Sequence, residues 1–206
     1  RQAEIVLDVG NRGTQRELLR FFVDKNVLFV GTMNEDESTQ SLSDKVIDRS
    51  NILRFGTPKS LSTPKGNASD AEPGRLTADT WTRWCRNYQR QLTAAEQEQL
   101  LSRIQTLSGA LKSIGRPFAY RVAQAMLEYI ANYPHPDRYN QAFADQIEQR
   151  ILPKLNGLDL QNTNSKKAIE SVLKVVSELD DEELGAQIAA CRKEHDYFQW
   201  LGMDRT

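Results

Sequence analysis

The chain has 206 residues and a formal net charge of -1, with acids and bases mixed along its length. This length is enough for one large domain or two small ones with a buried core, and the near-neutral charge gives no sign of a general polyanion-binding surface. No apolar run approaches the length of a membrane span, and no signal peptide is visible. Cys85 and Cys191 are isolated cysteines, which favours a reduced, cytoplasmic protein over a disulfide scaffold.

The first part of the sequence predicts strands. The chain opens, without an initial Met, inside an alternating stretch from Glu4 to Val9, so we expect a fragment of a longer protein that begins in a half-buried strand. Arg16–Phe22 is compatible with a helix turn or with an extended segment. The apolar run Val27–Val30 predicts a buried strand that stops at Gly31. Asn34 then lies just past the C-terminal end of that strand, where open α/β sheets bind ligands.

A short helix and a further strand are predicted next. Ser43 has the character of an N-cap for a helix over Asp44–Asp48, which ends at Arg49. Ile52–Phe55 predicts a second strand. The following segment, Gly56–Gly74, is rich in Gly, Pro, Ser and Thr, which is typical of a linker.

The rest of the chain predicts helices only. The spacing of Trp81, Trp84, Cys85 and Tyr88 predicts one helical face between about Thr80 and Gln91. A capping box at Thr93–Glu96 opens the next helix, and Gly115 closes it. Pro117 is suited to start another helix. The positions predicted to point inward are Leu100, Ile104, Leu107, Leu111 and Ile114 in the first of these, and Val122, Met126 and Ile130 in the second.

Three more helices complete the prediction. Tyr133–Pro136 breaks the pattern, after which Phe143, Ile147 and Ile151 share a face as far as about Pro153. Asn156-Gly157 is a stop signal. Helices are then predicted over Ser165–Leu179 and Asp181–Trp200.

Residues 26–55 resemble the second half of the core of an AAA+ ATPase, with the McrB-like and MoxR-like branch closest. The resemblance lies in Gly31-Thr32-Met33-Asn34, in Asp36-Glu37-Ser38-Thr39 and in Lys45-Val46-Ile47-Asp48-Arg49. It implies that Asn34 is the sensor 1 residue, which orients water at the γ-phosphate in its own subunit. Spacing alone also fits an Asn that stabilises a turn after a strand.

The resemblance implies that Arg49 is an arginine finger, which offsets charge on the phosphoryl group in a neighbouring subunit. Such a residue requires an oligomer, and members of the resembled family form rings. The alternative from sequence alone is a solvated Arg, or one paired with Asp44 or Asp48. Arg121 best matches the place of the sensor 2 Arg, although Tyr120 replaces the usual Pro; Arg116 competes for that role, and a plain surface Arg is the alternative.

Two other patterns carry no chemistry in our interpretation. The acids Glu35, Asp36 and Glu37 favour a solvated loop over a metal site, because successive side chains point apart. Gly56-Thr57-Pro58-Lys59-Ser60 ends like a P-loop, but it lacks the Gly before the Lys and a following helix. The phosphate-binding and magnesium-binding motifs would therefore lie upstream in the resembled family.

The expected architecture is an α/β fragment of a P-loop AAA+ core at 1–58, a linker at 59–78 and a helical lid at 79–206, α-rich overall. The expected function is that of the C-terminal part of an oligomeric nucleoside triphosphatase, of the restriction or defence type. It would use ATP, with GTP left open, and Mg²⁺ in the full-length protein, and a nuclease or DNA partner would be compatible. We expect no bound cofactor and no hydrolysis in this fragment alone. The alternative is a non-enzymatic helical interaction module.

Overall fold

The computed structural model describes residues 3–12, 15–24, 26–34, 42–55, 74–85, 87–135, 139–192 and 196–203. The chain divides into two compact units, Arg1–Ser41 and Leu42–Thr206. The acids at 35–37, the rejected P-loop pattern and the predicted linker as far as residue 73 lie outside the described residues. The predicted domain boundaries at 58 and 79 stay predictions, and the segment 42–55 belongs to the helical unit.

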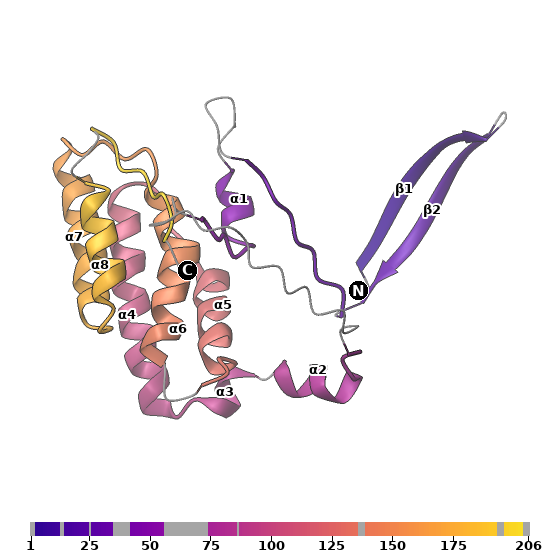
Figure 1. Cartoon of the computed structure of the whole chain (residues 1–206), viewed down its shortest axis with the longest axis horizontal. Coiled ribbons are helices and arrows are strands. Elements are labelled where there is room, and N and C mark those ends of the chain that lie inside the picture. The colour runs from indigo at the N-terminus through magenta and orange to yellow at the C-terminus, as the bar shows by residue number, and fades with distance from the viewer. Residues whose placement is uncertain are drawn as a thin grey trace, which may run out of the picture. The chain divides into compact units, whose positions relative to one another are not determined.

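The first unit contains an antiparallel hairpin of β1 (Ala3–Arg12) and β2 (Gln15–Val23) (Figure 1). The predicted strand at Glu4–Val9 is confirmed, and Arg16–Phe22 is extended and not helical. Ile5 pairs with Phe21 and Leu7 with Leu19, so these apolar side chains share one face of the ribbon. On the other face Arg20 donates to Glu4 at 3.2 Å.

Val27–Val30 is not a buried strand, and that prediction is wrong. The segment pairs with no strand among the described residues, and Phe29 and Val30 are 74% and 91% exposed. A strand is buried only where other strands flank it and helices cover it, and the only described sheet is the two-stranded β1–β2 hairpin. The apolar composition was recognised correctly, but the neighbours that would bury it are not in the described structure.

The second unit begins with α1 (Asp44–Ile47), close to the predicted Asp44–Asp48. Ser43 is its N-cap residue in backbone position, although its side chain makes no capping bond. Ile47 is buried, and α1 packs on η3 (Leu152–Leu155), a 3₁₀ turn of the helical body. Ile52–Phe55 does not form the predicted strand. It makes a single parallel bridge, from Phe55 to Met203.

The predicted helix over Thr80–Gln91 is two helices, α2 (Ala78–Trp84) and α3 (Tyr88–Gln91). Asn87 caps the second one by accepting from the amide of Gln89 at 2.8 Å. The predicted apolar face is therefore split, because the break at Cys85 changes the direction of the chain. Tyr88 is buried, whereas Trp84 is 60% exposed.

The following helices agree with the sequence pattern. In α4 (Ala94–Ser113) the capping box is present, with Thr93 and Glu96 bonded in both directions. Its predicted inward residues are buried, except that Ile114 is only partly buried. Each fully buried leucine there contributes about 1.5–3 kcal/mol. Gly115 has φ +74°, the left-handed conformation that ends the helix without steric cost. The next helix, α5 (Tyr120–Ala131), begins three residues later than Pro117 and buries Val122, Met126 and Ile130 as predicted.

The remaining elements close the core. A continuous helical segment runs through α6 (Tyr139–Gln146), the π-helix η2 (Ile147–Ile151) and η3, and α7 (Thr163–Ser177) packs on α4. The last helix, α8 (Glu182–Ala190), is shorter than predicted, because residues 196–203 form an extended tail. In this tail, Phe198 donates its amide to the carbonyl of Leu158 and accepts from the amide of Gly157, both at 2.8 Å. Figure 1 shows α4 to α8 side by side as a bundle.

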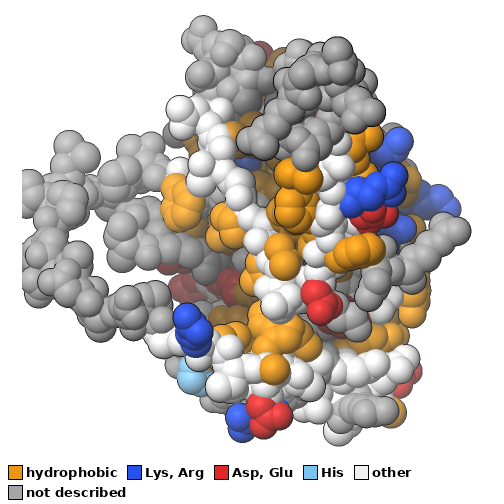
Figure 2. Space-filling view, turned by 90° about the vertical axis from the view of Figure 1, so that its right-hand side faces the viewer, with side chains coloured by type: hydrophobic (Ala, Val, Ile, Leu, Met, Phe, Trp, Pro, Cys, Tyr) orange, Lys and Arg blue, Asp and Glu red, His pale blue; other side chains and the backbone are white. Residues whose placement is uncertain are grey.

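The described chain is thus rich in helix, with one two-stranded sheet, which confirms the coarse α-rich prediction. None of the described helices is long and apolar enough to cross a membrane. Hydrophobic side chains reach the surface in several places on the face drawn in Figure 2. Neither cysteine is in a disulfide; Cys85 is exposed and Cys191 is buried.

Candidate functional site

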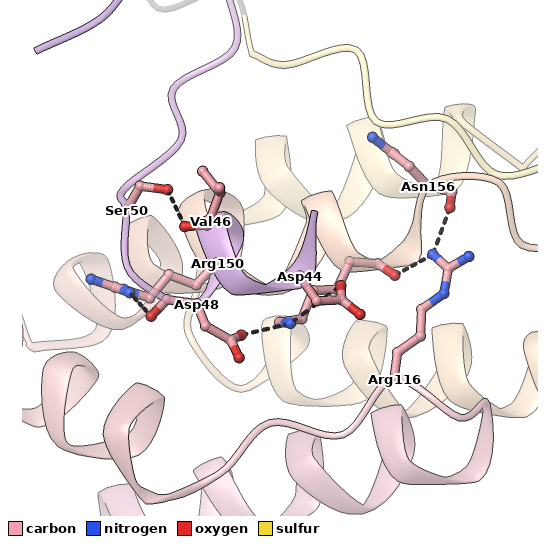
Figure 3. A network of polar contacts seen from close by, with 8 residues as sticks. Asp44, Val46, Asp48, Ser50, Arg116, Arg150 and Asn156 are labelled. Atoms are coloured by element: carbon pink, nitrogen blue, oxygen red, sulfur yellow. Dashed lines mark hydrogen bonds and ion pairs between the residues drawn. The ribbon is translucent and has the colours of Figure 1, made fainter. Parts of the chain in front are cut away.

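A buried lysine joins α1 to the helical body. Lys154 Nζ lies 2.7 Å from Asp48 Oδ1 and 3.7 Å from Asp44 Oδ1. The Lys154 side chain is 1% exposed, whereas those of Asp48 and Asp44 are 31% and 67% exposed. The cation is therefore out of water, and the two carboxylates that neutralise it approach from the solvent side. Figure 3 shows how Asp44 and Asp48 project from α1 toward the helical body.

The peptide group between Asp48 and Arg49 is hydrogen-bonded through both its amide and its carbonyl. The amide of Arg49 donates to the carbonyl of Val46 at 3.0 Å. The carbonyl of that same peptide belongs to Asp48, and it accepts from Arg150 Nη1 at 3.4 Å. Ser50 Oγ also donates to the Val46 carbonyl, at 2.7 Å. The backbone on which Arg49 stands is therefore fixed by bonds to its own turn and to the π-helix (Figure 3).

The π-helix and the 3₁₀ turn bring unusual polar residues into the core. Burial lowers the pKa of Arg150, and the carboxylate of Asp48 opposes that shift. Arg150 Nε also donates to Gln146 Oε1 at 2.9 Å. A π-helical turn inserts one residue into an α-helix and is common at functional sites. Here it changes the direction of the side chains just before Pro153, which itself has no amide to donate.

Arg116 fixes the end of the same segment. One nitrogen of its guanidinium lies 2.6 Å from the carbonyl oxygens of both Lys154 and Asn156. The side chain of Asn156 in turn accepts from the amide of Trp200 at 2.7 Å, which ties the C-terminal tail to this point. Arg116 therefore has a structural role already, which disfavours it as a residue that contacts phosphate.

Arg49 and Arg121 are both exposed. Neither side chain makes a hydrogen bond or ion pair with the described part of the chain, so the alternative that Arg49 pairs with Asp44 or Asp48 is wrong: those acids pair with Lys154. Arg121 lies in the first turn of α5, as predicted. No contact among the described residues joins Arg49 to Arg121.

Asn34 is exposed and belongs to the first unit, whereas Arg49 and Arg121 belong to the second. The three predicted site residues are therefore not brought together within one described unit. Their assigned roles stay predictions.

Sequence reasoning missed Lys154, Arg150 and their contacts with α1. A signal was present, because two basic residues four positions apart lie within the otherwise apolar run that ends the helix. Residues at that spacing share a helical face, and this face is buried. Charged side chains on a buried face require partners, and Asp44 in α1 and Asp48 directly after it supply them.

Fold and site together define a helix-rich domain with a short helix, α1, anchored on it through buried charges. The chain belongs to the family described as a domain of unknown function (DUF8727), whose model matches residues 73–197. No curated protein and no solved structure matches the chain.

Proposed function

We propose that this chain is the C-terminal part of an AAA+ nucleoside triphosphatase that works as a ring motor. In this proposal Arg49 acts on the nucleotide of a neighbouring subunit, Asn34 acts in its own subunit, and Arg121 reaches the γ-phosphate from the helical lid. ATP and Mg²⁺ would bind the full-length protein, with GTP as an open alternative for the nucleotide.

One observation carries the proposal: Arg49 combines a fixed backbone with an exposed guanidinium. Its peptide group is held by Val46 and Arg150, and Asp48 beside it is held by Lys154. Phosphoryl transfer depends mainly on positioning and on offsetting negative charge, so an arginine that acts across an interface needs both properties.

The test uses mixed rings of the full-length protein. Arg49→Ala should abolish nucleotide hydrolysis and leave nucleotide binding unchanged, because the finger would serve the neighbour's site. Mixing Arg49→Ala subunits with Asn34→Ala subunits should restore part of the activity, since each subunit supplies what the other lacks. Lys45→Ala is the matched control, an exposed cation on the same short helix whose loss should have little effect. Failure of the mixture to recover activity would contradict the action in trans.

A second candidate is a non-enzymatic helical interaction module. It is favoured by the extent of the family match, which covers residues 73–197 and so includes Arg121 but not Asn34 or Arg49. The helices also bury a core of their own, with residues such as Leu107, Phe143 and Ile169 fully buried. A phosphate-binding loop and a strand ending in Asp-Glu upstream in the full-length protein would favour the motor, and their absence there would favour the module.

A further inference from the structure

The contact between α1 and the helical body is built from charges, not from apolar packing alone. Within α1 only Ile47 is buried, and the helix has four residues. A helix of this length is unstable by itself, because its few hydrogen bonds do not offset the entropy of ordering it. Its position therefore depends on what holds it to the rest of the unit.

Two side chains of one segment hold α1 at two neighbouring points. Lys154 of η3 pairs with the carboxylate of Asp48, and Arg150 of η2 donates to the carbonyl of the same residue. The next residue in the chain is Arg49. Both contacts therefore act on the residue that directly precedes the proposed finger.

Because Lys154 is buried, the contact between α1 and η3 strongly favours one relative position of the two elements. Because the Lys154 side chain is 1% exposed, no water shell can replace a lost carboxylate, and Asp48 at 2.7 Å is its nearest anionic partner. Asp44 at 3.7 Å is more exposed and is a weaker partner. The position in which Asp48 meets Lys154 is thus strongly preferred over others that leave the cation unpaired.

We propose that Lys154 is a positioning residue for Arg49. It fixes α1 so that movement of the η2–η3 segment in the lid of one subunit moves the arginine presented to the next subunit. This inference rests on the proposed function. It assigns to the η2–η3 segment a role in transmitting lid movement from one nucleotide site to the next.

The first experiment needs no nucleotide and uses this chain. Hydrogen exchange should be measured at the amides of Asp48 and Arg49, which donate to Asp44 and Val46. In Lys154→Met we expect exchange at these amides to become at least about tenfold faster, because local opening no longer separates an ion pair. Exchange in α4 should stay unchanged, which shows that the variant folds, and Lys45→Met is the control. Equal exchange in Lys154→Met and the parent chain would overturn the positioning role.

If Lys154→Met also loses protection in α4, Asp48→Asn replaces it, since the amide keeps the shape of the carboxylate but not its charge. For Asp48→Asn, the expected result and the result that would overturn the proposal are those given for Lys154→Met. Amides of α1 that exchange without protection in the parent chain would likewise overturn the proposal, because α1 would then not be held.

The second experiment uses mixed rings of the full-length protein. Lys154→Met subunits should bind nucleotide normally and hydrolyse it slowly. Mixing them with Asn34→Ala subunits should restore part of the activity, as is expected when Arg49→Ala subunits are mixed with the same partner. A purely structural defect would not be rescued by that partner. If Arg49→Ala is rescued and Lys154→Met is not, the positioning role fails while the proposed function stands. If neither is rescued, the proposed function fails.

Discussion

Arg116 holds the backbone of Lys154, with one guanidinium nitrogen 2.6 Å from the Lys154 carbonyl oxygen. The same nitrogen bonds the carbonyl of Asn156. The residue whose ammonium group anchors α1 is therefore itself anchored through its main chain. The exact place of the cation in the core depends on a residue nearly forty positions earlier in the sequence.

Replacing Arg116 with Ala should lower the free energy of unfolding by on the order of 2–3 kcal/mol, because two carbonyl groups lose a charged donor. Arg121→Ala is the matched control, since Arg121 is exposed, and should change the value by less than about 0.5 kcal/mol. Urea denaturation followed by the helical circular dichroism signal measures both. Equal effects of the two substitutions would show that the Arg116 contacts contribute nothing to stability.

Asp48→Ala and Asp44→Ala should differ strongly in their effect on stability. Removal of Asp48 leaves Lys154 without its close partner in a buried place, which costs on the order of 3 kcal/mol. Asp44 is 67% exposed and lies farther away, so its removal should cost less than about 1 kcal/mol. The midpoints of urea unfolding of the two variants give the comparison. A larger loss for Asp44→Ala would mean that the ion pairs are ranked wrongly.

Gly202→Ala and Gly109→Ala should change stability in opposite directions. Gly202 has φ +90°, and a Cβ there would collide with the backbone carbonyl of Arg54, so alanine should cost about 2 kcal/mol or more. Gly109 lies in α4 with nothing near an added Cβ, so alanine should stabilise the helix by roughly 0.5–1 kcal/mol. Thermal unfolding of the two variants tests the pair, and shifts of the same sign would contradict it.

The capping box of α4 should make stability depend on pH through Glu96. Hydrogen bonds from the backbone and side chain of Thr93 lower the pKa of Glu96 below its ordinary value of 4.5. A carboxyl with a lowered pKa contributes stability above its unfolded-state pKa and loses that contribution as the pH falls through the folded-state value. Glu96→Gln should therefore flatten the acid side of the stability profile relative to the parent chain. Urea midpoints at pH 7 and pH 3 test this, and parallel profiles would rule out a contribution of Glu96.

Local patterns in the sequence predicted most of the helical unit. The course of α4 follows from its capping box and from the period of its apolar residues, and both are properties of neighbouring positions. The break after Trp84 was missed, because the apolar spacing continued across it while Asn87 began a new helix. A capping residue within a periodic stretch is the sign that was available.

Contacts between distant residues could not be predicted in the same way. Arg150 and the Asp48 carbonyl are 102 positions apart, so no local pattern links them. The exposure of Val27–Val30 has a similar origin, because apolar composition shows what a segment can bury but not which neighbours surround it. Arg49 was chosen from a resemblance, and its exposed guanidinium and fixed backbone became visible only in the structure.

The π-helix between Ile147 and Ile151 lets this segment absorb a change of one residue in its length. A π-helical turn holds about one residue more than an α-helical turn, so a deletion within 147–151 would return the turn to α-helical geometry and leave the later side chains facing nearly the same way. A deletion within the α-helical part, 139–146, would instead rotate the residues on its two sides by about 100° relative to one another around the axis. Related chains should therefore keep Lys154 facing Asp48 when a one-residue gap falls within 147–151, whereas a gap within 139–146 should coincide with changes at positions 44 and 48.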